Sequence, residues 1–252
     1  MRRNKARFIG MLVLIAMLAA FPLAAGATHS WGGYHWARTA NPFTLKVGDN
    51  VTSAWDSYLD TTISDWSQSN VLDLTKVTGS TTGRKCRAAA GRIEVCNAAY
   101  GNNGWLGLAQ IWLSNGHISQ GTAKMNDSYF NQAQYNNPNE KNHVMCQEVG
   151  HTFGLGHTSE DGSTQNTCMD YSQSPTSTHP NQHDYDELGI IYAHLDSFNS
   201  FTSAPAGFAN ADVHAQENWG QKVHESADGH SALYVRDFGN GFKIFTFVFW
   251  AK

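Results

Sequence analysis

The sequence predicts an α+β domain, and three observations lead to this expectation. Short apolar runs in the first half of the chain follow the order strand, helix and then four further strands. Two helical patterns come next, between about residues 142 and 195. The last part of the chain, from residue 232 to residue 250, consists of two β-rich runs that are separated by a turn.

The first elements are predicted by their apolar spacing. Residues 43–47 alternate between apolar and polar side chains, which is typical of a half-buried strand. From Ser53, a plausible N-cap, the residues Trp55, Leu59, Ile63 and Trp66 follow one face of a helix. Further strands are expected at 71–77, 92–95 and 105–113, with a short edge strand at 123–126.

The later elements begin with a helix from Asn142 to about Leu155. A loop rich in glycine, serine and threonine follows at 158–167, and Pro180 starts another helix that runs to about residue 195. Residues 237–241 form a good hairpin turn between the two last strands. We therefore expect a main domain at 28–196 and a small, appended β segment at 197–252.

The N-terminal segment predicts export. A basic start, a long apolar run and small residues up to Ala27 are typical of a secretory signal peptide over residues 1–27. The alternative is a membrane anchor, which Pro22 and the small residues make less favourable. We expect a secreted monomer that has no stable association with membranes once the signal peptide is removed.

Charge and cysteine content narrow the class of protein further. The formal net charge is −4, and 15% of the residues are charged, so nothing suggests a nucleic-acid partner. Four cysteines behind a signal peptide predict two disulfides, for which three pairings exist. The local pairing Cys86–Cys96 leaves Cys146–Cys168, which would join the helix at 142–155 to the segment that follows it.

The chemistry is concentrated in residues 147–157. Positions four residues apart on a helix differ by only about 40°, so Gln147 and His151 share a face and can approach one metal ion. Glu148 stands beside them and can hold a metal-bound water. Gly154 lets the chain leave the helix, so that His157 can turn back as a third ligand.

Two neighbouring residues fit this site less well. Cys146 lies about 140° around the helix from His151, which favours a disulfide over metal ligation. His143 is on the correct face but roughly 12 Å along the axis from His151, so the two could share a metal only if the helix were broken. The sequence does not explain His179, His183, His214, His224 and His230, which are expected at the surface.

The segment resembles the metal-binding motif H-E-x-x-H-x-x-G-x-x-H of the metzincin clan of zinc endopeptidases, with Gln147 in place of the first histidine. Residues 167–171 resemble the Met-turn of that clan, in which Met169 matches the methionine beneath the metal and Tyr171 the nearby tyrosine. The resemblance covers about residues 43–195. It implies a twisted mixed sheet with an active-site helix and a C-terminal helix.

The resemblance also implies a function. Zn²⁺ would be held by Gln147, His151 and His157, while Glu148 would act as general base on the zinc-bound water and Tyr171 would help to stabilise the oxyanion. The substrates would be proteins or peptides.

The glutamine leaves alternatives open, because its neutral oxygen is a weaker zinc donor than imidazole. Zinc could bind through another donor instead, or the site could be empty. The alternatives are therefore a catalytically inactive secreted binding protein that keeps the metzincin fold, or a hydrolase of a different amide bond.

Overall fold

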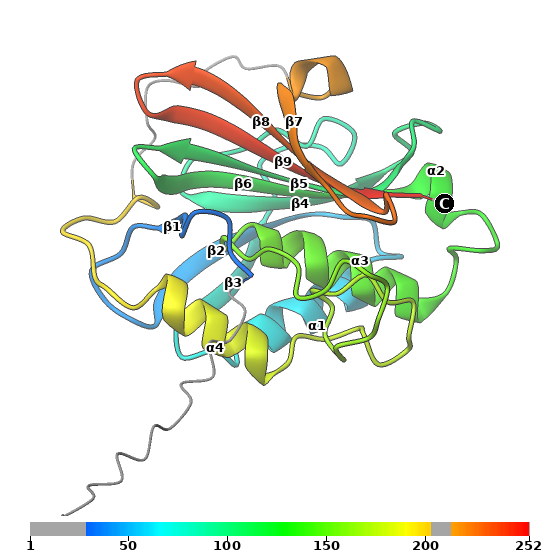
Figure 1. Cartoon of the computed structure of the whole chain (residues 1–252), viewed down its shortest axis with the longest axis horizontal. Helices are drawn as coiled ribbons and strands as arrows, with labels where there is room; N and C mark the ends of the chain where they lie inside the picture. The colour runs from blue at the N-terminus through cyan, green and yellow to red at the C-terminus, as the bar shows by residue number, and fades with distance from the viewer. Residues whose placement is uncertain (1–28, 203–212, 252) are drawn as a thin grey trace, which may run out of the picture.

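The computed structural model describes residues 29–202 and 213–251, so the expected signal peptide at 1–27 lies outside the described residues. The fold is α+β, with a mixed sheet of nine strands and helices packed on one of its faces (Figure 1). The strands are β1 (His35–Trp36), β2 (Phe43–Asn50), β3 (Leu72–Thr78), β4 (Arg92–Ala98), β5 (Trp105–Ser114), β6 (His117–Asn126), β7 (Gln221–Glu225), β8 (Ser231–Gly239) and β9 (Phe242–Trp250). The helices are α1 (Asp56–Trp66), α2 (Asp127–Phe130), α3 (Pro138–His151) and α4 (Gln182–Ile191), with a 3-10 turn at Gln216–Asn218.

The sheet follows the order β3-β2-β4-β6-β5-β9-β8-β7, and β1 pairs with β6 outside this path. The strands β2, β3, β4 and β6 are parallel, whereas β5 and the three C-terminal strands run antiparallel to their neighbours. The segment 123–126 is not an edge strand: it is the end of β6, which lies between β4 and β5. The sequence pattern identified only the end of this strand, because the residues that extend it back to His117 are largely polar.

The C-terminal segment continues the main sheet. The strand β9 pairs with β5 along its length, and β8 and β7 follow it. Alternate residues of β9 explain this position, since Phe245, Phe247 and Phe249 face the core under the helices while Ile244 and Val248 face a second apolar cluster. A strand that is buried on both faces needs hydrogen-bonding neighbours on both sides.

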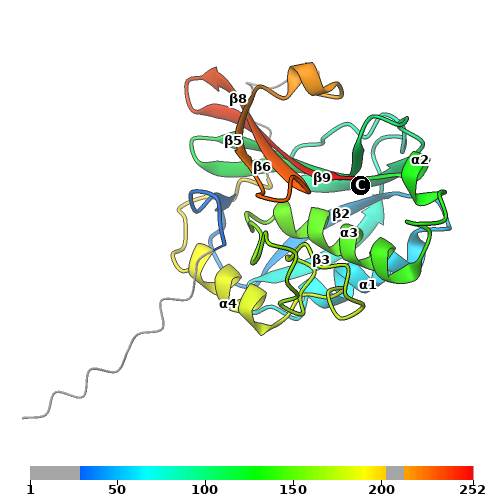
Figure 2. The same ribbon diagram turned by 45° about the vertical axis from the view of Figure 1, so that its right-hand side comes forward.

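The helix α3 packs against β5 and β6 and lies beside α1, which itself contacts β3 (Figures 1 and 2). It begins at Pro138 with Asn137 as N-cap, whose side chain accepts from the backbone of Glu140, and it ends at His151. The expected start at Asn142 was therefore too late, because an Asn-Pro start signal lies five residues upstream. The helix α1 also differs from its expectation, since its N-cap is Trp55 and no side chain caps it.

Both expected disulfides are present: Cys86–Cys96 and Cys146–Cys168. The second bond joins α3 to the loop before α4, and Trp66 of α1 donates a hydrogen bond to the Cys146 carbonyl at 3.1 Å. The helix that carries Gln147 and His151 is thus fixed from two sides. Among the described residues, no helix is long and apolar enough to cross a bilayer.

Candidate functional site

The motif selects Gln147, Glu148, His151 and His157, which we call the helix cluster, and the structure places the rings of His151 and His157 in contact. The first three lie in the last turns of α3, and each is at most 1% exposed. The imidazoles of His151 and His157 meet edge to face with ring centroids 4.5 Å apart. The reversal between them depends on Gly154, which has φ +99° and no space for a Cβ beside the Tyr34 carbonyl.

The hydrogen bonds of Gln147 fix its amide in one orientation. Its Nε2 donates to the carbonyl oxygens of Cys168 at 2.9 Å and Asp170 at 2.8 Å. The other atom of the amide, Oε1, is buried and has no hydrogen-bond partner. A buried acceptor without a partner costs about 1–3 kcal/mol, so this oxygen is a candidate ligand for a cation.

The two histidines are oriented in a similar way by backbone and carboxylate oxygens. His151 Nδ1 lies 2.8 Å from the Leu155 carbonyl, which favours a proton on Nδ1 and leaves Nε2 as the free acceptor. His157 Nδ1 lies 3.5 Å from Glu160, and the Tyr171 hydroxyl lies near both ring nitrogens of His157, 2.5 Å from Nδ1 and 2.7 Å from Nε2. Burial lowers the pKa of both histidines, so the neutral, metal-binding form is favoured.

The loop beneath the helix supplies Met169 and Tyr171. A Cβ on Gly150 would lie 2.6 Å from Met169 Sδ, so the glycine allows the methionine to pack directly under α3. The loop itself is organised by the buried Asp170, whose carboxylate accepts from the backbone of Gln165 and Ser172. Asp170 therefore has a structural function that the sequence did not reveal.

Glu148 is the buried carboxyl group of the site. Desolvation raises its pKa well above the ordinary value, and its Oε2 has no hydrogen-bond partner. Gly107 of β5 packs against it so closely that a Cβ there would lie 2.4 Å from Oε1. A carboxyl group in this environment can accept a proton and hold it.

The C-terminal strands cover the helix cluster. The ring of Phe247 stacks on His151 with centroids 4.4 Å apart, and Phe249 packs at 5.7 Å from Tyr171 and 5.8 Å from His143. His224 of β7 lies 2.7 Å from Glu160, which in turn faces His157. Sequence analysis missed these contacts, because the alternating phenylalanines of β9 predict a buried face but not its partner.

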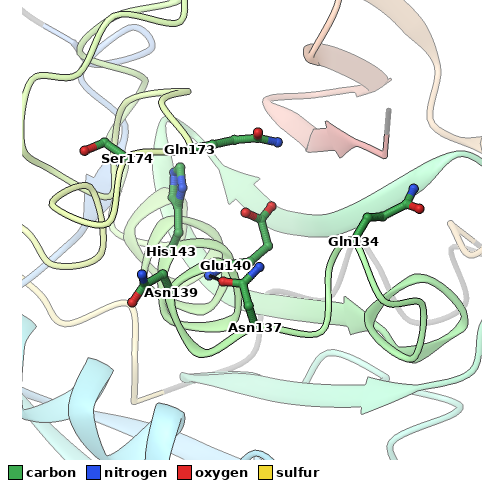
Figure 3. A pocket seen from close by; sticks show the side chains of 7 residues that line it. All are labelled: Gln134, Asn137, Asn139, Glu140, His143, Gln173 and Ser174. Atoms are coloured by element: carbon green, nitrogen blue, oxygen red, sulfur yellow. Dashed lines mark hydrogen bonds between the residues drawn. The ribbon is translucent and has the colours of Figure 1, made fainter.

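A small polar pocket opens beside the cluster, at the N-terminal half of α3 (Figure 3). His143 lines it and contacts Gln147 across 3.4 Å, so the pocket adjoins the Gln147 side of the cluster. His143 was correctly placed on the Gln147 face, and Nε2 approaches the Asp170 carbonyl at 2.9 Å. In Figure 3, Glu140 rises beside His143, and its buried Oε1 has no hydrogen-bond partner.

No family model matches the chain, and no curated protein shows significant similarity to it.

Proposed function

We propose that the chain is a secreted zinc-dependent endopeptidase. Its catalytic centre is the helix cluster, which β9 covers. The observation that carries this proposal is the fixed amide of Gln147. Two backbone carbonyls hold its nitrogen and leave its oxygen buried and without a partner, on the helical face that also carries His151. The metzincin-like motif and the order of sheet, motif helix and final helix also support it.

The donor set fits zinc. The amide oxygen of Gln147 and the neutral imidazoles of His151 and His157 would supply three ligands, the number that catalytic zinc sites take from the protein. The Leu155 carbonyl faces Nδ1 of His151, and Glu160 faces Nδ1 of His157. Metal-binding histidines usually have such a partner at the ring nitrogen that does not bind the metal. When bound there, zinc would supply a Lewis acid that polarises a scissile carbonyl and lowers the pKa of water.

The remaining steps belong to the protein. Glu148 takes a proton from the attacking water and passes it to the leaving amine. The Tyr171 hydroxyl, beside His157, can donate to the carbonyl oxygen as negative charge develops on it. The product is a cleaved peptide bond with a new amine and a new carboxylate.

The strand β5 is the surface on which we place the substrate. In β9, Phe247 pairs with Ala109 and Phe249 with Gly107, directly over Glu148. An extended peptide that replaced β9 at this edge would form the same backbone hydrogen bonds and bring its own peptide groups to the helix cluster. We infer that β9 occupies the position of a substrate and that its displacement opens the enzyme.

The closed site also favours the second candidate function, a secreted binding protein that has the fold without turnover. Such a protein would hold β9 permanently on β5, and its Gln147 would serve only the Cys168 and Asp170 carbonyls. Hydrolysis of another amide, such as one in a cell-wall peptide, would use the same residues.

Cleavage of casein and of a mixed peptide library tests the proposal. We expect hydrolysis by the zinc-loaded protein, loss of hydrolysis with a chelator and recovery when zinc is returned. The substitution Gln147→His, which completes a set of three imidazoles, should tighten zinc binding and retain activity. Activity in Gln147→His with none in the wild type would support the binding protein. Cleavage that a chelator does not affect would show that the centre is misassigned.

A further inference from the structure

Three imidazoles and a carboxylate meet at a second place in the fold, and we call His35, His117, His194 and Asp196 the strand-end cluster. His35 Nε2 lies 3.4 Å from Asp196 Oδ2, and the Nε2 atoms of His117 and His194 lie 3.1 Å and 3.7 Å from Oδ1. Ligand atoms of His35, His117 and Asp196 all lie within 4.8 Å of one another. We propose that this cluster is a zinc site with a structural function.

The distances are of the size that a tetrahedral site requires. Nitrogen and oxygen donors bind zinc at about 2.0–2.2 Å, which places two donors of a tetrahedron roughly 3.3–3.6 Å apart. The Nε2 atoms of the three histidines lie 3.1–3.7 Å from the nearest Asp196 oxygen, which spans this range. His35, His117 and Asp196 supply three donors, and the largely exposed His194 can swing in as the fourth.

The buried member of the cluster presents a free nitrogen. His35 Nδ1 lies 2.9 Å from the Gly33 carbonyl, which fixes its proton on Nδ1 and leaves a lone pair on Nε2. That Nε2 is buried without a hydrogen-bond partner, and the residue is 6% exposed.

The carboxylate is positioned by the protein. Oδ2 of Asp196 accepts from the backbone nitrogen and the guanidinium of Arg38, both at 3.1 Å. Oδ1 is left to face His117 and His194. An ion pair between a protonated His117 and Asp196 would account for one imidazole. It does not account for the rings of His117 and His194 both packing against His35, with centroids 5.0 Å and 4.8 Å away.

A metal at this position would join segments that are far apart in the sequence. His35 is in β1, His117 begins β6, and the other two follow α4, whose chain runs back past β1 (Figure 1). Asp196 also donates its backbone NH to the Arg38 carbonyl at 2.8 Å. This hydrogen bond holds the segment after α4 beside the segment after β1. Binding would stabilise this junction, because the unfolded chain does not hold the donors together.

Zinc titration of a protein without the helix cluster tests the proposal independently of the proposed enzyme. The variant His151→Ala/His157→Ala, stripped with chelator, should bind one zinc per chain by elemental analysis. Its unfolding midpoint should rise by roughly 5–10 °C at a free zinc concentration of about 100 times Kd. Less than a tenth of an equivalent together with an unchanged midpoint would overturn the proposal.

A second pair of variants locates the metal in an otherwise unchanged protein. In the wild-type background, His117→Ala should lower the zinc affinity of this site at least tenfold and abolish its contribution to the midpoint. The matched control is His179→Ala, which removes another partly exposed histidine that is paired with an aspartate, Asp65. If His117→Ala and the control retain the same zinc and the same midpoint, the cluster is an ordinary ion-pair network.

Discussion

The helix cluster and the strand-end cluster use similar side chains but are assembled in different ways. The helix cluster comes from eleven consecutive residues, so its donors are set by one helix and one turn. The strand-end cluster joins β1, the start of β6 and the segment after α4. Local geometry can be read from spacing, whereas a site built from distant segments exists only once the sheet has formed.

The two clusters also differ in their access to solvent. Gln147, Glu148 and His151 are at most 1% exposed beneath β9, while the His194 side chain is 62% exposed. A buried, covered centre suits chemistry that must exclude water until a substrate arrives. The strand-end cluster is largely buried at His35 and Asp196 and open at His194, which suits a metal that stabilises the fold at a chain junction.

The largest expected effect separates catalysis from metal binding. Glu148→Gln keeps the shape of the side chain but cannot accept the proton, so we expect at least a 10²-fold loss of peptide hydrolysis. Zinc content should be unchanged at both clusters, because Glu148 is not a ligand in this account. Rates on a fluorogenic peptide and elemental analysis on the same preparation provide the comparison. Undiminished hydrolysis would remove Glu148 from the mechanism.

Removal of a disulfide should affect the helix cluster selectively. The Cys146–Cys168 bond closes 22 residues between α3 and the loop of Met169, and Cys146→Ala/Cys168→Ala should lower the free energy of unfolding by about 3 kcal/mol. Zinc should then dissociate faster from the helix cluster. The control is Cys86→Ala/Cys96→Ala, which removes the other disulfide, between β4 and the loop that precedes it. Equal zinc release from both variants would contradict the selective effect.

The covering strand should respond to a single side chain. Phe247→Ala removes the ring that stacks on His151. Displacement of β9 then costs less free energy, and each 1.4 kcal/mol of this decrease raises the population of the open form about tenfold. We expect about a tenfold faster hydrolysis of short peptides at temperatures well below the unfolding midpoint. Val248→Ala, on the opposite face of β9, is the matched control and should not activate the protein. Equal rates in both variants would mean that β9 does not control access.

Much of the helix cluster was predictable, and the reasons are local. The spacing of the motif specified the helical face shared by Gln147 and His151 and the turn at Gly154. The disulfide Cys146–Cys168 was the pairing that remained after the local Cys86–Cys96 bond. The α+β class followed from the order of apolar runs. Pairing of β9 with β5 was not predictable, because alternation identifies a strand but not its neighbour.

The smallest expected effect concerns substrate preference at the pocket that His143 lines. Glu140 has a buried Oε1 without a partner there, and burial raises its pKa. A substrate lysine or arginine would satisfy this carboxyl group, so Glu140→Gln should raise KM for such peptides by roughly fivefold, about 1 kcal/mol, with kcat retained. Peptides with an apolar residue at the same position are the internal control. An equal change for both classes would place the preference elsewhere.

The most direct test of the central claim is the zinc content of a protein that lacks the strand-end cluster. The variant His35→Ala/His117→Ala, purified without chelator and supplied with zinc, leaves the helix cluster as the proposed binding site. We predict close to one zinc per chain, which the further change Gln147→Leu should lower by removing the amide oxygen. Less than a tenth of an equivalent in the folded variant would contradict the account, because the helix cluster would then hold no metal.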